Sequence, residues 1–111
     1  MASSTKSYNL GRFNEGVNFL RPERTVSDSG ARSTEYVLHA QALAEISDDL
    51  SEAKELQQAL AEEESYCVKT WTIGGVTTEF RVEYDGKQFD IVKIQRQMRG
   101  ISFYYIKRND L

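Results

Sequence analysis

The chain has 111 residues, 40% of them hydrophobic and 28% charged, with a formal net charge of −3, which is the composition of one globular domain. Its single cysteine, Cys67, excludes an intramolecular disulfide and therefore a secreted disulfide scaffold. No apolar stretch resembles a signal peptide or approaches the roughly 20 residues of a membrane-spanning helix. We expect a protein that is made in a reducing cytoplasm and either stays there or enters a particle assembled there. Cys67 is expected to be a small core or sheet residue, with a reactive thiol as the alternative.

The N-terminal part predicts a strand that is followed by a turn. Val17 and Phe19 alternate with polar residues, as in a half-buried strand. Pro22 follows closely, which places the far end of this strand at a sheet edge or a bend. The polar cluster at residues 27–30 predicts a turn, in which Gly30 can adopt a positive φ.

Residues 33–46 fit two structures. Strand spacing places one set of side chains on a single face: Tyr36, Leu38, Ala40, Ala42, Ala44 and Ile46. Helix spacing also produces an apolar stripe: Val37, Ala40, Leu43 and Ala44. The alanines favour a helix and the Tyr-Val pair favours a strand, so periodicity alone leaves both structures open.

The connection at residues 47–65 predicts one α-helix, from Asp49 to Glu63. Asp49 and Glu52 have the spacing of a capping box, in which each side chain satisfies an amide at the helix start. Apolar residues then recur at intervals of three and four: Leu50, Ala53, Leu56 and Leu60.

The remainder of the chain predicts β-structure. An aromatic and β-branched run at residues 66–73 ends at two glycines, and a second run, at residues 80–84, alternates apolar and charged side chains. Asp85 and Gly86 follow at once, and residues 89–94 resume the apolar pattern. Asp-Gly between two alternating runs is the strongest short-range signal for a two-residue hairpin turn.

A basic loop at residues 95–100 precedes the last predicted strand, residues 101–106. Its Arg96 and Arg99 are candidates for contact with DNA or with a partner protein. Strand alternation places the neighbouring aromatic side chains mostly in the core, and the sequence pI of about 5.2 argues against phosphate affinity. A nucleic-acid-binding barrel of the OB type is therefore an alternative that we favour less.

The residues provide no catalytic, metal-binding or cofactor-binding pattern. The single histidine, His39, has no spaced second ligand, whereas a zinc site needs three or four. The chain contains no glycine-rich phosphate loop and no nucleophile elbow. Paired carboxylates such as Asp48-Asp49 lack the apolar context that raises a catalytic pKa. We predict a protein that is not an enzyme and needs no cofactor.

Charge is unevenly distributed along the chain. Residues 1–65 carry 6 basic and 12 acidic side chains, whereas residues 66–111 carry 8 basic and 5 acidic ones. Two interpretations fit this pattern. The charges can belong to an ordinary solvated surface, or they can form unlike faces through which identical subunits meet in a ring.

The segment from Phe80 to Ile94 resembles the signature hairpin of the phage head–tail joining, or head-closure, family. That hairpin has an Arg-hydrophobic-x-Tyr strand, a tight x-Gly turn, an aromatic-x-Ile strand and a hydrophobic pair. Phe-Arg-Val-Glu-Tyr-Asp-Gly-Lys-Gln-Phe-Asp-Ile-Val-Lys-Ile is similar to it in order and spacing. The order of the elements upstream also resembles that of the family, so the likeness covers residues 12–108.

This resemblance implies a fold that is mainly β (α+β), a small antiparallel β-barrel of five or six strands with one helix in the 47–65 connection. Residues 33–46 then form a strand with Ala40 and Ala44 on its buried face. We expect a flexible N-terminal tail, residues 1–11, and a single domain, residues 12–111.

The resemblance further implies a structural virion protein, made in the cytoplasm of a host bacterium. Identical subunits would form a ring at the head–tail interface, with a portal or adaptor protein on the head side and a tail-completion or tail-tube protein on the tail side. Genomic DNA would lie in the channel without sequence-specific contact, and no membrane is involved. A tail-completion or minor tail adaptor is the alternative. Four polar segments are candidate docking loops: 1–11, 21–33, 47–65 and 74–79. One of the last two segments would block the channel.

Overall fold

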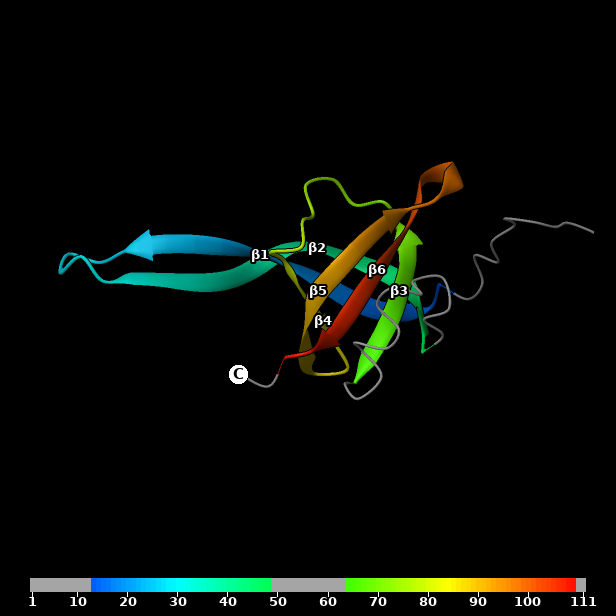
Figure 1. Ribbon diagram of the computed structural model, residues 1–111, viewed down its shortest axis with the longest axis horizontal. Helices are drawn as coiled ribbons and strands as arrows, with labels where there is room; N and C mark the ends of the chain where they lie inside the picture. Colours follow the sequence, from blue (N-terminus) through cyan, green and yellow to red (C-terminus); the bar gives the residue numbers. More distant parts are fainter. Residues whose placement is uncertain (1–12, 49–63, 110–111) are drawn as a thin grey trace, which may run out of the picture.

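The computed structural model describes residues 13–48 and 64–109, which form six β-strands (Figure 1). They are β1 (Glu15–Val26), β2 (Arg32–Ser47), β3 (Ser65–Trp71), β4 (Arg81–Tyr84), β5 (Lys87–Arg96) and β6 (Ile101–Arg108), with a short 3-10 turn, η2 (Met98–Gly100). The predicted mainly β class is confirmed. The helix predicted at residues 49–63 and the tail at residues 1–11 lie outside the described residues.

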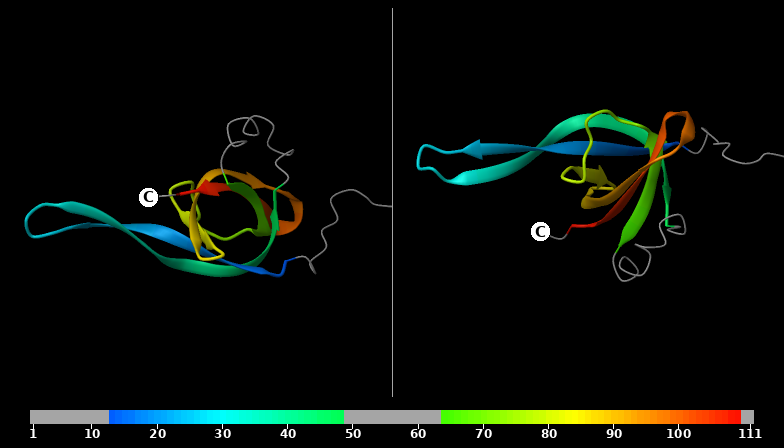
Figure 2. Two further views of the ribbon diagram at one scale, coloured as in Figure 1. Left: turned by 90° about the horizontal axis from the view of Figure 1, so that it is seen from below. Right: turned by 45° about the horizontal axis from the view of Figure 1, so that its top comes forward.

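All neighbouring strands are antiparallel and follow the order β1-β2-β3-β6-β5-β4. The sheet closes on itself as a barrel because β4 pairs with β1, and the left view of Figure 2 shows this ring of strands. The β1–β4 contact is short, with paired residues only from Asn18 to Leu20 on β1. Beyond Leu20, β1 therefore has β2 as its one neighbouring strand among the described residues.

β2 resolves the ambiguity at residues 33–46 in favour of a strand. It pairs with β1 from Ser33 through Ala44 in one ladder, interrupted by a single register shift between Phe19 and Leu20. Ala44 is fully buried and Ala40 is half-buried, as the family resemblance implied. Pairing with β1 thus decides between two structures that local propensity left open.

The segment at residues 21–33, which we predicted to be a polar loop, belongs instead to a long β-hairpin arm (Figure 1). We define the arm as residues 21–37. Its strands pair without interruption to a turn in which the Gly30 N–H donates to the Ser27 carbonyl at 2.9 Å and Gly30 has a φ of 83°. Pro22 is compatible with this strand because β1 is an edge strand here, and edge strands are where sheets tolerate proline.

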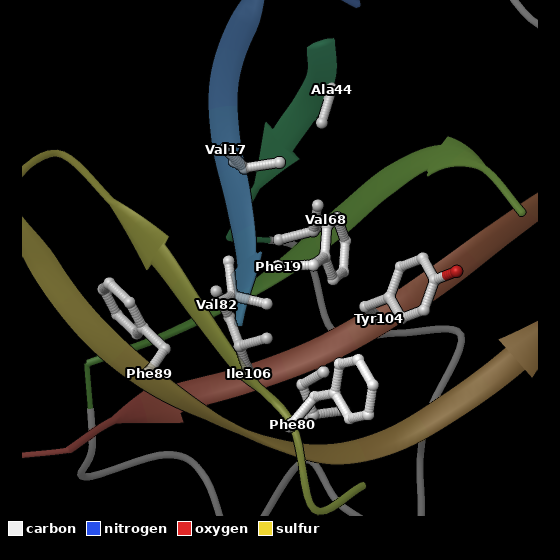
Figure 3. Packing of buried hydrophobic residues seen from close by; sticks show 10 residues of the cluster. Val17, Phe19, Ala44, Val68, Phe80, Val82, Phe89, Tyr104 and Ile106 are labelled. Carbon is white, nitrogen blue, oxygen red and sulfur yellow. The ribbon is translucent and has the colours of Figure 1, made fainter. Parts of the chain in front are cut away.

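The barrel interior is filled by side chains from every strand (Figure 3). Phe19 and Tyr104 meet edge to face with ring centroids 4.9 Å apart, and the Ile73 N–H donates to the Tyr104 hydroxyl oxygen at 3.1 Å. The buried cluster comprises Val17, Phe19, Ala44, Val68, Phe80, Val82, Phe89, Ile91, Tyr104 and Ile106.

β6 is buried on both of its faces. Tyr104 and Ile106 point into the barrel interior. Ile101, Phe103 and Tyr105 alternate with them on the other face, where they join a second buried cluster with Phe13 and Cys67. The predicted core role of Cys67 and of the β6 aromatic residues is therefore confirmed.

Candidate interaction surfaces

His39 has a structural environment. Its Nε2 lies 2.8 Å from the Gly74 carbonyl oxygen, to which it donates, and its ring meets Phe80 edge to face at 5.0 Å. Residues 13–48 and 64–109 contain no group of three side chains suited to hold a metal ion. Within the same ranges, no helix has the length and hydropathy needed to span a membrane. The candidate functional features described below are surfaces of the described residues.

The arm is one such surface, and its two faces differ in charge. Glu23 and Glu35 lie directly opposite each other on β1 and β2, so they share a face. Arg21 contacts Glu23 at 2.8 Å on this face. Arg24 and Arg32 occupy alternate positions and thus the other face, together with Val26, which is 67% exposed.

Two contacts attach the base of the arm to the barrel. The Arg24 guanidinium lies 2.7 Å from the Glu79 carboxylate, in the connection between β3 and β4. The Arg81 guanidinium of β4 stacks over the Tyr36 ring at 3.9 Å. The first pair is exposed and contributes little stability, whereas a stacked and partly shielded cation–π contact contributes more. These contacts connect the arm to β4 and to the segment that precedes it.

The residues predicted for the hairpin turn, Asp85 and Gly86, join β4 to β5. Their φ values are 56° and 73°, and the flanking residues Tyr84 and Lys87 are paired. Two consecutive positive φ values are the geometry of a type I′ turn, whose twist matches that of the flanking strands. Asp85 and Gly86 therefore form the two-residue turn of the β4–β5 hairpin.

The predicted basic loop is shorter in the structure, because β5 continues to Arg96. We define the arginine turn as residues 96–100. The Gln97 N–H donates to the Ile101 carbonyl at 2.8 Å, and the Gly100 carbonyl accepts from the Thr72 N–H at 2.7 Å, which fixes the turn beside the end of β3. Arg96 and Arg99 are exposed, and neither has an ion-pair partner among the described residues.

The aromatic side chains that follow the arginine turn do not form a platform for nucleic-acid bases. Phe103, Tyr104 and Tyr105 are each at most 5% exposed, so their rings are not available for stacking on a single strand. The arginine turn instead borders the exposed ring of Trp71, because Gly100 lies beside that ring.

Sequence reasoning did not identify an apolar groove of about 440 Å³ where β2 and β3 diverge. Leu43 and Trp71 border it and are among the most exposed large hydrophobic residues described, at 59% and 51%. The groove is lined by Phe13, Gln41, Ala42, Leu43, Thr70, Trp71 and Ile73. The alternation of apolar and polar residues within β2 and β3 was the one sequence signal for this groove. That alternation does not reveal that the two strands separate here.

Glu64 forms a polar cluster that connects three strands. Its carboxylate accepts hydrogen bonds from the Tyr66 hydroxyl at 2.9 Å, from Arg108 at 3.0 Å and from Lys87 at 3.3 Å. The bond from Tyr66 is the main reason that the pKa of Glu64 lies below its usual 4.5, and Arg108 and Lys87 act in the same direction against partial desolvation. The same bond raises the pKa of Tyr66.

This cluster predicts a specific pH dependence of stability. A carboxyl group whose folded-state pKa is lowered stabilises the fold above its unfolded pKa, and this contribution is lost as the pH falls through the folded pKa. Glu64→Gln should therefore be less stable than the wild type at pH 7, and the difference should shrink below pH 4.5. Urea midpoints of both proteins between pH 7 and pH 3 measure this, and a pH-independent difference would contradict it.

The chain is similar to known proteins in sequence and in fold. Residues 8–109 match the family described as "Phage head completion protein". Protein SF1141 from Shigella flexneri 2a, a solution structure, has a TM-score of 0.71 at 13% identity, with 93% of this chain and 98% of that chain covered. A chain in the virion of a native gene transfer agent particle has a TM-score of 0.57 at 11% identity, with coverage of 88% and 94%.

No curated protein matches the sequence significantly. The two structural neighbours have low identity, so they establish the shared fold alone. The family match is stronger evidence, because it spans nearly the whole chain and includes the Asp85–Gly86 hairpin on which the resemblance rested. The chain therefore belongs to the phage head completion protein family.

Proposed function

We propose that this protein closes the DNA-filled head of a tailed phage as a ring of identical subunits at the head–tail interface. The single observation that carries the proposal is the family match over residues 8–109. The shape of the subunit supports it, because a closed barrel that presents an arm and an exposed basic turn offers several contact surfaces (Figure 1). Such a subunit suits a structural role rather than catalysis.

The partners follow from this position in the virion. The ring would contact a portal or adaptor protein on the head side and a tail-completion or tail-tube protein on the tail side. Genomic DNA would meet it in the channel through contacts that read no sequence. The connection at residues 74–79 is a candidate for the channel-facing segment, because Gly74 and Gly75 form an exposed turn there.

Electron microscopy of DNA-filled, tail-less heads from phage that lack this gene product tests the proposal. Purified protein should add a ring of density at the portal vertex and should reduce the nuclease-accessible DNA that leaks from these heads. A protein that leaves the heads undecorated but binds the end of isolated tails would instead be a tail-completion adaptor. Binding to neither structure would contradict both assignments.

A further inference from the structure

The arm and the arginine turn lie at opposite ends of the subunit. Figure 1 shows the arm extending to the left and the turn between β5 and β6 at the upper right, along a longest dimension of 63 Å. The two views of Figure 2 agree with this separation. Neither surface can therefore reach the other within one chain.

The arm has an unbalanced negative face. Like charges directly opposite each other on neighbouring strands destabilise a hairpin, and Glu23 and Glu35 are such a pair. Arg21 offsets Glu23, but Glu35 has no ion-pair partner among the described residues. A two-stranded ribbon is also marginally stable by itself. The unpaired carboxylate of Glu35 leaves this face suited to a cationic partner from another molecule.

The arginine turn has the complementary character. Arg96 and Arg99 are exposed without ion-pair partners in the described ranges, and Met98 between them is 58% exposed. The exposed ring of Trp71 lies beside the turn. Arginine, tryptophan and methionine are the residue types enriched where proteins bind each other.

We propose that the arginine turn of one copy binds the Glu23–Glu35 face of the arm of a second copy. The inference rests on the proposed function, for which it names the contact between ring subunits. Two different surfaces of the same chain meet, so the interface is heterologous and each copy has one turn and one arm to offer. Repetition of this contact closes a ring or extends a filament.

A cysteine pair tests the contact directly. Glu35→Cys and Arg99→Cys in one chain should, on oxidation at high protein concentration, produce a ladder of cross-linked oligomers, because each subunit can join two neighbours. Cys67 is buried and does not interfere. The control pair, Glu35→Cys with Lys107→Cys, moves the second thiol to the other end of β6. Ladders of equal intensity for both pairs would overturn the proposal.

Charge reversal tests the electrostatic basis. Arg99→Glu should weaken self-association about tenfold, since like charges would then face each other. Glu35→Arg should weaken it similarly, although within one chain it converts a repulsive cross-strand pair with Glu23 into an attractive one. The melting temperature of Glu35→Arg should therefore hold or rise while association falls. If Glu35 served only the fold of its own subunit, the melting temperature and self-association would change in the same direction.

Combining Glu35→Arg with Arg99→Glu should restore association, measured by sedimentation velocity, and Lys107→Glu should leave it unchanged. Without restoration, the two residues do not face each other. If Arg99→Glu instead removes binding to a DNA duplex and leaves association intact, the turn is a DNA contact. A ring at the portal vertex without the cysteine ladder would refute this interface and support the proposed function. The ladder without a ring at the portal would support this interface and refute the proposed function.

Discussion

Replacing Phe89 with alanine is expected to lower the free energy of unfolding by about 3–5 kcal/mol. Phe89 is fully buried and lies opposite Val82 in the β4–β5 ladder (Figure 3). Its ring contacts the rings of Tyr66 and Tyr84 at centroid distances of 5.7 and 6.4 Å. The barrel closes around this position, so the strands cannot collapse fully into the cavity that alanine leaves.

A change of this size is a large part of the roughly 5–15 kcal/mol that stabilises a typical domain. Urea denaturation followed by tryptophan fluorescence measures it, since Trp71 is the single tryptophan. Arg96→Ala is the matched control on the same strand, because this exposed side chain should change stability by no more than about 0.5 kcal/mol. If the two variants lost similar stability, Phe89 would not be a core residue of the folded protein.

The β4–β5 hairpin could be predicted because its determinants are local. Alternation from Phe80 to Tyr84 and the Asp-Gly pair specify both strands and their turn within a few residues of each other. β2 could not be assigned from its own residues, because its alanines satisfy helical and extended spacing equally. Its conformation depends on pairing with β1, which precedes it in the sequence and is separated from it by a turn. This pairing is apparent only in the folded structure.

The arm was interpreted as a loop for a related reason. Its residues have no buried face, so the alternation that marks a half-buried strand is absent, and Pro22 reads as a break. What holds the arm is the register of β1 with β2 and the stacking of Arg81 on Tyr36, both of which depend on strand pairing.

The candidate surfaces were predictable only in part. Arg96 and Arg99 were identified because a cluster of cations in a predicted loop is visible in the sequence. Glu35 was not, because its significance comes from Glu23 across the ladder, twelve positions away. The groove at Leu43 and Trp71 was also missed, since it exists where two strands separate rather than where a motif occurs.

Gly86→Val is expected to lower the free energy of unfolding by about 1–3 kcal/mol. Gly86 has a φ of 73°, which a β-branched residue adopts only with strain. A Cβ placed at this glycine meets no atom within 4 Å, so the cost is backbone strain and not a steric clash. The loss should therefore depend on the conformational preference of the new residue more than on its size.

Two variants separate these causes by thermal denaturation. Gly86→Asn should lose much less stability than Gly86→Val, because asparagine tolerates the left-handed conformation. Gly16→Val is the matched control, since Gly16 also has open space around its Cβ position but no positive φ, and valine favours a strand. A melting temperature for Gly86→Val equal to that of the wild type would show that the Asp85–Gly86 turn relaxes without cost. The register of the hairpin would then depend on the packing of Val82 against Phe89 rather than on the turn.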